Sequence, residues 1–182
     1  NLSDEMLPIF YVAGSQTLPA PLEQKEEEIK KGNKIIGLAE VTGPGVIVTL
    51  TDSKKDINSA LDPSSLVVHD LDVLSVINEL ENAGAEAISI NDERIINMTD
   101  IVSVNENTVI RVNQQRVVSP YVVKAIGNQT YLTSTLCMKN SGFIDSYKNS
   151  GKTVTLEKQR NIKIPKYSEN IDIKYMKEVA GE

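Results

Sequence analysis

The chain has 182 residues, a net charge of −6 at pH 7 and a pI near 5.0. This acidic balance argues against binding to nucleic acid or to a membrane surface, because both need a basic stripe and none is visible. The hydrophobic fraction of 40% and the charged fraction of 24% are typical of a globular protein, and the length favours one domain.

The N-terminal part of the sequence contains no membrane span. Its longest apolar run, from Met6 to Gly14, is interrupted by Pro8 and is far shorter than the ~20 residues of a span. Because the chain starts at Asn1 without an initiator Met, we expect a natural N-terminal part, with any membrane anchor, to be missing. Residues 1–21 are rich in proline, which predicts an irregular lead-in.

A charged helix is predicted next. Leu22, Ile29 and Ile36 are spaced seven apart, as in one seam of a coiled coil that would allow a homodimer. The second apolar position of each heptad holds Lys, Glu, Gly or Asn instead. This favours a surface helix over a coiled coil.

A strand, a helix and a second strand follow in order. The glycines around Pro44 punctuate the entry to a β-branched strand, 46–50, and a polar surface loop is predicted over 52–65. Apolar residues then recur at helical spacing up to Leu80, with Asp70 or Asp72 as N-cap. Gly84 suits the left-handed C-cap, and the apolar segment 85–90 predicts a central strand.

The second half of the chain predicts a meander and then short helices. The β-rich segments of the meander are 94–97, 101–104, 108–112 and 116–118. Ser119-Pro120 predicts the start of a short helix that ends at Gly127. Asn128 is predicted to be the N-cap of a second helix that reaches Leu136. A third helical piece is expected over 141–148, ending at Gly151, before a half-buried strand that leads to Pro165.

This order of elements predicts an α+β fold. We expect a split β-α-β sheet (ferredoxin-like, α-β plait type) with helices on one face and an inserted β-meander, preceded by an N-terminal helix. The predicted organisation is a lead-in and helical segment over 1–40, a globular domain over 41–165 and a tail over 166–182. One contiguous core is expected, formed by Val46 to Leu50, Val73, Leu74, Ile77, Leu80, Ile88 and Ile90.

Catalytic and metal sites find little support in the sequence. His69 with Asp70 and Asp72 could bind a cation, but no further ligands are identifiable, and capping of a helix is the better interpretation. Cys137 lacks a nucleophile signature and is expected to be a small buried residue. We therefore predict no catalytic residue, no metal and no cofactor.

A few polar residues are candidates for binding: Arg94, Asn91, Asn78, His69 and Asp72. The alternative for the asparagines is that they pin turns by hydrogen bonds. Arg94 follows the central strand, and its fork of donors can clamp a carboxylate or a pair of backbone carbonyls. Our hypothesis is recognition: Arg94→Ala should leave thermal stability nearly unchanged but weaken capture of a partner.

Several motifs in order resemble one bacterial family. They are Val41-Thr-Gly-Pro-Gly-Val, the 72–80 helix with Asn78-Glu-Leu80, the segment 84–91 with Arg94, and Ser119-Pro-Tyr-Val-Val-Lys-Ala-Ile-Gly127. Over 36–165 the chain resembles the YlxW/YlxX-like family, domain of unknown function 881. The resemblance implies an N-terminal membrane segment and coiled coil, a domain outside the cytoplasmic membrane, genes that neighbour cell-division genes, and no established catalytic residues.

Two functions remain open. The favoured one is a non-catalytic, extracytoplasmic domain of a membrane-anchored protein that binds envelope or division proteins. The alternative is a small-ligand-binding or regulatory domain of the α/β-plait type. A deep pocket lined by His69, Asn78 and Arg94 would favour the alternative, whereas a flat apolar patch or an exposed strand edge would favour protein binding.

Overall fold

The computed structural model describes residues 20–54, 63–104, 109–139, 142–149 and 152–179. Within these ranges no helix is both long enough and apolar enough to cross a membrane. Pro8, Pro19 and Gly151 lie outside the described residues, as does most of the predicted loop over 52–65. The described part of that loop includes a short 3-10 helix, η2 (Pro63–Leu66).

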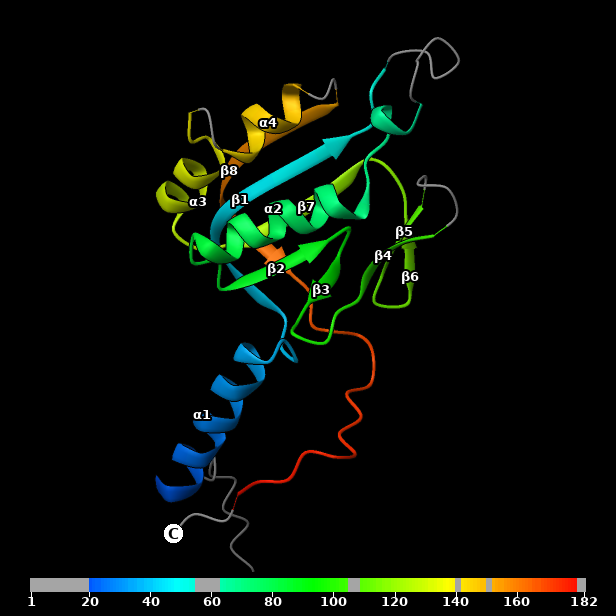
Figure 1. The fold of residues 1–182 in the computed structure, drawn as a ribbon. Helices are drawn as coiled ribbons and strands as arrows, with labels where there is room; N and C mark the ends of the chain where they lie inside the picture. Colours follow the sequence, from blue (N-terminus) through cyan, green and yellow to red (C-terminus); the bar gives the residue numbers. More distant parts are fainter. Residues whose placement is uncertain (1–19, 55–62, 105–108, 140–141, 150–151, 180–182) are drawn as a thin grey trace, which may run out of the picture.

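The protein is a mixed α+β fold built on a five-stranded antiparallel sheet (Figure 1). The strand order is β3-β2-β7-β1-β8, so β3 and β8 are the two edges. Its strands are β1 (Val41–Thr51), β2 (Ala87–Ile90), β3 (Glu93–Ile95), β7 (Tyr121–Ile126) and β8 (Thr153–Ile164). Since β7 pairs antiparallel with both β1 and β2, those two strands run parallel and are joined by a helix.

Three helices pack against the sheet and complete the main core. They are α2 (Asp70–Asn82), α3 (Gln129–Leu136) and α4 (Phe143–Asn149). Side chains from all three join one cluster of buried residues with β1, β2 and β7. The predicted N-cap of α3 is confirmed, because the Asn128 side chain accepts hydrogen bonds from the backbone N–H groups of Thr130 and Tyr131.

Helix α2 forms where the sequence predicts it. Val73, Ile77 and Leu80 are buried and recur at helical spacing. Gly84 has a φ of +83° just beyond the C-cap, and the next N–H, of Ala85, donates to the Leu80 carbonyl at 2.9 Å. A left-handed residue at this position closes the last turn, as expected of glycine.

The predicted core needs two corrections. Leu74 is only partly buried, and Val76 takes a place in the core instead, because the α2 stripe facing the sheet runs through 73, 76, 77 and 80. Ile47 packs on the opposite face of the sheet with a second cluster. Alternate residues of a strand point to opposite faces, so the run 46–50 is divided between two cores.

The helix predicted from Ser119-Pro120 to Gly127 is wrong. Residues 121–126 form strand β7, which lies in the middle of the sheet between β1 and β2. Tyr121, Val123 and Ala125 face the main core in strand alternation. Backbone pairing on both sides, together with the β-branched pair Val122-Val123, outweighs the local helix signal of Ser-Pro.

The predicted meander divides between two sheets. Strand β3 joins β2 as a hairpin at the edge of the main sheet, whereas a separate three-stranded antiparallel sheet has the order β4-β5-β6. Its strands are β4 (Ile101–Val104), β5 (Val109–Val112) and β6 (Gln115–Val117). Ile110, Val112 and Val117 of this small sheet also enter the main core.

The Gly43-Pro44-Gly45 segment lies inside β1, where the pairing with β8 shifts register. A Cβ atom on Gly45 would lie 1.8 Å from the carbonyl oxygen of Ala125 in β7. No side chain fits there, so the glycine permits the close approach of the two strands. The segment thus lies within the strand rather than at its entry, where the sequence analysis placed it.

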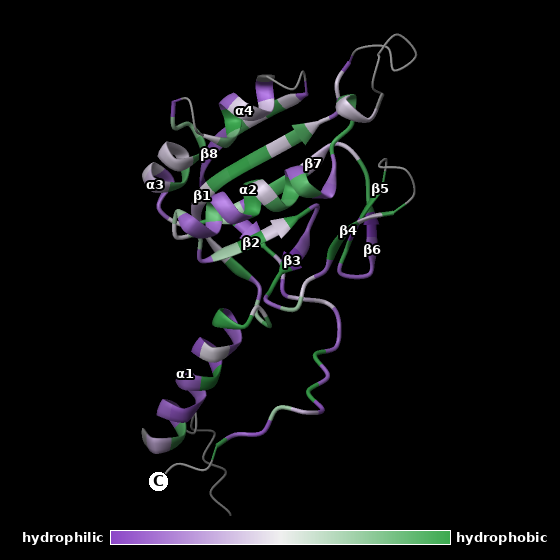
Figure 2. Ribbon diagram, viewed as in Figure 1, coloured by the Kyte–Doolittle hydropathy of each residue, from purple (hydrophilic) through white to green (hydrophobic). Residues whose placement is uncertain are grey.

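Helix α1 (Ala20–Ile35) and the tail, 166–179, leave the body at the same end (Figure 1). Pro21 lies in the first turn of α1, where proline is tolerated. Figure 2 shows α1 as mostly hydrophilic, and its apolar residues Leu22 and Ile29 are exposed. The start of the tail is fixed to the body, because the Tyr167 N–H donates to the Gly37 carbonyl at 2.8 Å.

Candidate functional site

The structure does not bring the candidate binding residues together. His69 and Asp72 lie at the start of α2, and Asn78 is exposed further along the same helix. Asn91 and Arg94 belong to the hairpin of β2 and β3. The start of α2 and the β2–β3 hairpin therefore form two separate places.

At the start of α2, Asp72 holds a structural ion pair. Its Oδ2 accepts a hydrogen bond from the His69 N–H at 2.8 Å and another from Lys152 Nζ at 2.6 Å. The side chains of Lys152 and Asp72 are only 7% and 21% exposed. Lys152 Nζ also lies 5.2 Å from the centre of the Tyr147 ring. The N-cap residue is His69, not Asp70 or Asp72 as predicted. Asp72 is the third helical residue, and its carboxylate binds the N–H of the N-cap residue, as in a capping box.

The tyrosines near this ion pair stay protonated at neutral pH. Burial raises the pKa of Tyr121 to about 12, with a further contribution from the negative charge of Asp52. Burial also raises the pKa of Tyr147, reinforced by the charges of Asp72 and Asp52. Burying a phenol disfavours its charged form, so neither residue is poised to release a proton.

The His69 region does not gather metal ligands. His69 Nε2 lies 2.7 Å from the backbone oxygen of Ser64, and the Asp70 carboxylate accepts hydrogen bonds from the N–H groups of Leu71 and Ser103. Within the described ranges, no group of three or more His, Cys, Asp or Glu side chains is close enough to hold a metal ion. Cys137 is exposed at the end of α3, so the expectation of a buried cysteine is wrong.

Asn91 pins the chain at the start of β7. It has a φ of 45°, its Oδ1 accepts from the Val122 N–H at 2.7 Å, and its Nδ2 donates to the Pro120 oxygen at 3.2 Å. A short amide side chain suits this left-handed turn position and satisfies the neighbouring backbone. The hydrogen bonds fit the structural alternative for Asn91.

Arg94 is a buried clamp. Its side chain is 3% exposed, and its terminal nitrogens donate to the carbonyls of Ala39, Pro165 and Lys34, each at 3.3 Å. These acceptors belong to the end of α1, the segment before β1 and the residue after β8. The burial and the carbonyl contacts support a structural role for Arg94, and recognition of a partner protein stays a prediction.

Removing the Arg94 side chain should therefore destabilise the fold. We expect Arg94→Ala to lower the free energy of unfolding by about 1–3 kcal/mol, because carbonyls bound by a charged donor lose their partner. The matched control is Arg111→Ala, whose exposed pair with Asp100 at 2.7 Å should contribute only about 0–1 kcal/mol. Urea denaturation of both variants measures the difference, and equal losses would contradict the clamp.

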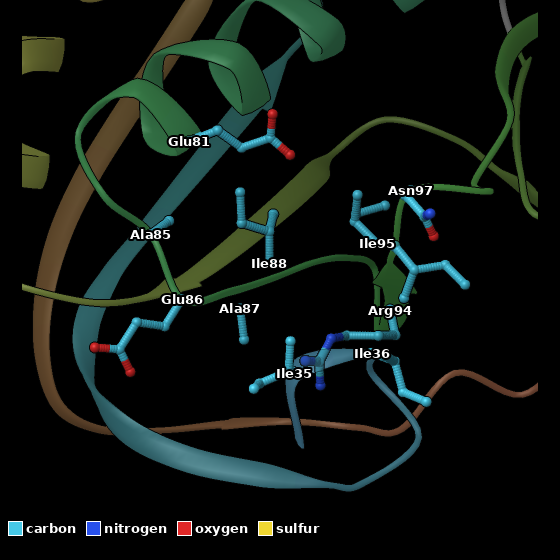
Figure 3. A pocket seen from close by; sticks show the side chains of 11 residues that line it. Ile35, Ile36, Glu81, Ala85, Glu86, Ala87, Ile88, Arg94, Ile95 and Asn97 are labelled. Carbon is cyan, nitrogen blue, oxygen red and sulfur yellow. The ribbon is translucent and has the colours of Figure 1, made fainter. Parts of the chain in front are cut away.

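A cavity lies beside Arg94, between the end of α1 and the β2–β3 hairpin (Figure 3). It has a volume of about 310 Å³ and adjoins a second hollow of about 460 Å³. Residues that line both are Ile35, Glu86, Ala87 and Arg94. Neither hollow is lined by His69 or Asn78, so these two hollows do not join the three polar candidates.

Sequence reasoning missed two buried polar residues. Lys152, the partner of Asp72, gives no local signal, since it lies 80 residues away. Asn113 is 3% exposed with a φ of 55°, and its Nδ2 donates to the Arg94 carbonyl at 3.2 Å, which docks the small sheet on β3. Its place between two short β-rich segments is a usable signal, because asparagine tolerates the left-handed conformation of hairpin turns.

Comparisons with known proteins identify relatives over most of the chain. The UPF0749 protein YlxW of Bacillus subtilis is 30% identical over 138 residues, which make up 76% of this chain and 58% of that protein. The UPF0749 protein YlxX of the same bacterium is 30% identical over 60% of this chain and 45% of its own length. The UPF0749 protein Rv1825 of Mycobacterium tuberculosis is 31% identical over 68% of this chain and 39% of its own length. The chain thus spans about half the length of these relatives.

A solved structure supports the same relationship. The crystal structure of an uncharacterized conserved protein from Mycobacterium tuberculosis matches with a TM-score of 0.66 and 26% sequence identity, covering 84% of this chain and 99% of that chain. The model of a family described as bacterial protein of unknown function (DUF881) matches residues 28–177. Together with the similarity to YlxW and YlxX, this match shows that the chain belongs to the YlxW/YlxX-like, DUF881 family of bacterial proteins.

Proposed function

We propose that this chain is a non-catalytic, protein-binding domain of a membrane-anchored bacterial protein. It lies outside the cytoplasmic membrane and serves the cell envelope or cell division. We also assign its main sheet to the split β-α-β, or α-β plait, type. The assignment is supported by the order β2-β7-β1-β8, with α2 between β1 and β2 and two helices between β7 and β8.

The observation that carries the binding proposal is the edge position of β8, where the Gln159 carbonyl accepts a hydrogen bond from Gln129 Nε2 at 2.6 Å. This strand has 12 residues, about twice the usual length, and within the described ranges it pairs only with β1. Its central stretch, 157–161, is exposed throughout. An edge strand presents unpaired N–H and C=O groups, so an extended segment of a partner protein can add to the sheet there.

The charged side chains of β8 disfavour pairing of this edge strand with a second copy of itself. Lys158, Arg160 and Lys163 are exposed along it, with Glu157 as the one acid. Charges on an edge strand discourage pairing between identical copies, since like charges would meet. They favour a partner segment that carries acidic side chains.

The course of the chain suits a tethered domain. Helix α1 and the tail project from one end of the body (Figure 1), whereas β8 is an edge strand of the sheet within the body. A stalk that continues α1 toward an anchor would leave this edge accessible. The relatives are longer than this chain, so they have room for such an anchor.

Charge reversal on β8 tests the binding proposal. We expect Lys158→Glu/Arg160→Glu in the full-length anchored protein to lower the yield of a crosslinked envelope partner at least about fivefold, because acidic partner segments would be repelled. The matched control, Lys139→Glu/Lys148→Glu, changes the net charge equally at exposed positions outside β8. Crosslinking in the native cells with mass spectrometry measures both yields. Equal yields from the two double variants would refute the β8 edge as the binding site.

A further inference from the structure

Arg94 carries a positive charge that no acid of the described chain neutralises. It is 3% exposed and forms no ion pair with any described carboxylate, and its acceptors are neutral carbonyls at 3.3 Å, long for hydrogen bonds. Its Nε is buried and has no hydrogen-bond acceptor within the described residues. Burial lowers the pKa of Arg94. A buried cation in this state favours an anionic partner.

The cavity brings this charge within reach of a ligand. Figure 3 shows the guanidinium beside Ile35, with the carboxylates of Glu81 and Glu86 lying away from it. The other lining residues of the two hollows include Asn97, Lys34 and Thr42, which are polar, but most are aliphatic: Ile36, Ala85, Ile88, Ile95, Ile96, Val41 and Ile126. A few polar groups within mainly apolar walls are typical of small-molecule sites, and the volumes lie at the small end of their range.

We propose that this cavity binds a small carboxylate that carries an apolar body, such as a medium-chain fatty acid. The carboxylate accepts a hydrogen bond from the Arg94 guanidinium where this residue lines the two hollows, and the aliphatic walls hold the chain. A volume of about 310 Å³ equals roughly ten water molecules at ~30 Å³ each, which suits octanoate with its about ten heavy atoms.

The inference is independent of the proposed partner at β8. The cavity lies toward the β2–β3 side of the sheet, and β8 is the opposite edge. A failure to bind octanoate would not change the crosslinking yield expected at β8. A failure of the crosslinking experiment would likewise not change the octanoate affinity expected at the cavity.

The test is calorimetric titration of the chain with octanoate, with octanol as the uncharged ligand of equal length. We expect octanoate to bind at least about tenfold more tightly than octanol, because only the carboxylate pairs with the buried guanidinium. No binding of octanoate, or equal affinity for the two ligands, would overturn the proposal.

A pair of variants at Ile35 locates the site without disturbing Arg94. Ile35 is 73% exposed, so its replacement does not threaten the core. Ile35→Glu places a carboxylate of the chain's own beside the guanidinium and should weaken octanoate binding at least about tenfold. Ile35→Gln has the same shape without the charge and should stay within about threefold of the parent chain. Equal effects of the two variants would overturn the role of Arg94.

Discussion

Replacing Ile77 by alanine is expected to lower the free energy of unfolding by about 2–5 kcal/mol, the range for truncating a buried branched side chain. Ile77 is 4% exposed and packs with Val48 and Leu50 of β1 in the main core. The loss combines the transfer free energy of the removed methyl groups with the cavity they leave. Urea denaturation at constant m-value measures it.

Two leucines of the same helix provide matched controls for Ile77. Leu74 is partly buried and should lose less than Ile77, whereas Leu71 is 71% exposed and should change the stability by less than about 0.5 kcal/mol. This gradient distinguishes packing against the sheet from a general effect on helix propensity. A loss under ~1 kcal/mol for Ile77→Ala would contradict the packing of α2 on the sheet.

Replacing Asp72 by alanine should also be costly, at about 2–4 kcal/mol. The variant leaves the Lys152 ammonium, 7% exposed, without its carboxylate, and it removes the acceptor of the His69 N–H. The expected loss of stability is smaller than for a fully buried ion pair, because the Asp72 side chain is 21% exposed.

The double variant Asp72→Ala/Lys152→Met separates the two contributions of Asp72. Removing both charges avoids the uncompensated ammonium, so the double variant should recover part of the loss. Thermal and urea denaturation of the single and double variants complete the cycle. A double variant that is as unstable as the sum of the two single ones would show that the ion pair is not coupled.

Local sequence patterns predicted correctly those elements whose local preference agrees with the tertiary contacts they make. Helix α2 is such a case, since its apolar spacing and Gly84 both point to the same boundaries. Strand β7 is the opposite case, because Ser119-Pro120 resembles a helix start while β1 and β2 pair with the segment from either side. Pairing between strands far apart in the sequence cannot be seen in a local pattern, and here it decides the structure.

The candidate site was predictable in its residue and in the kind of acceptor it binds, but not in which acceptors these are. The sequence indicated that Arg94 follows a buried strand and could clamp carbonyls. Its acceptors Ala39 and Pro165 lie 55 and 71 residues away, and no spacing rule connects them. The cavity is hidden in the same way, because the end of α1 and the β2–β3 hairpin form its walls jointly.

Site-specific photo-crosslinking in living cells tests the protein-binding proposal most directly. A photoreactive amino acid would replace Glu157 or Arg160 on β8 of the full-length protein, with Tyr131 on α3 and Asn78 on α2 as exposed controls. We predict a discrete crosslinked species from both β8 positions, with an envelope or division protein as its second component, and none from the controls. Crosslinks from α2 or α3 but none from β8 would contradict the proposal that the β8 edge is the binding surface.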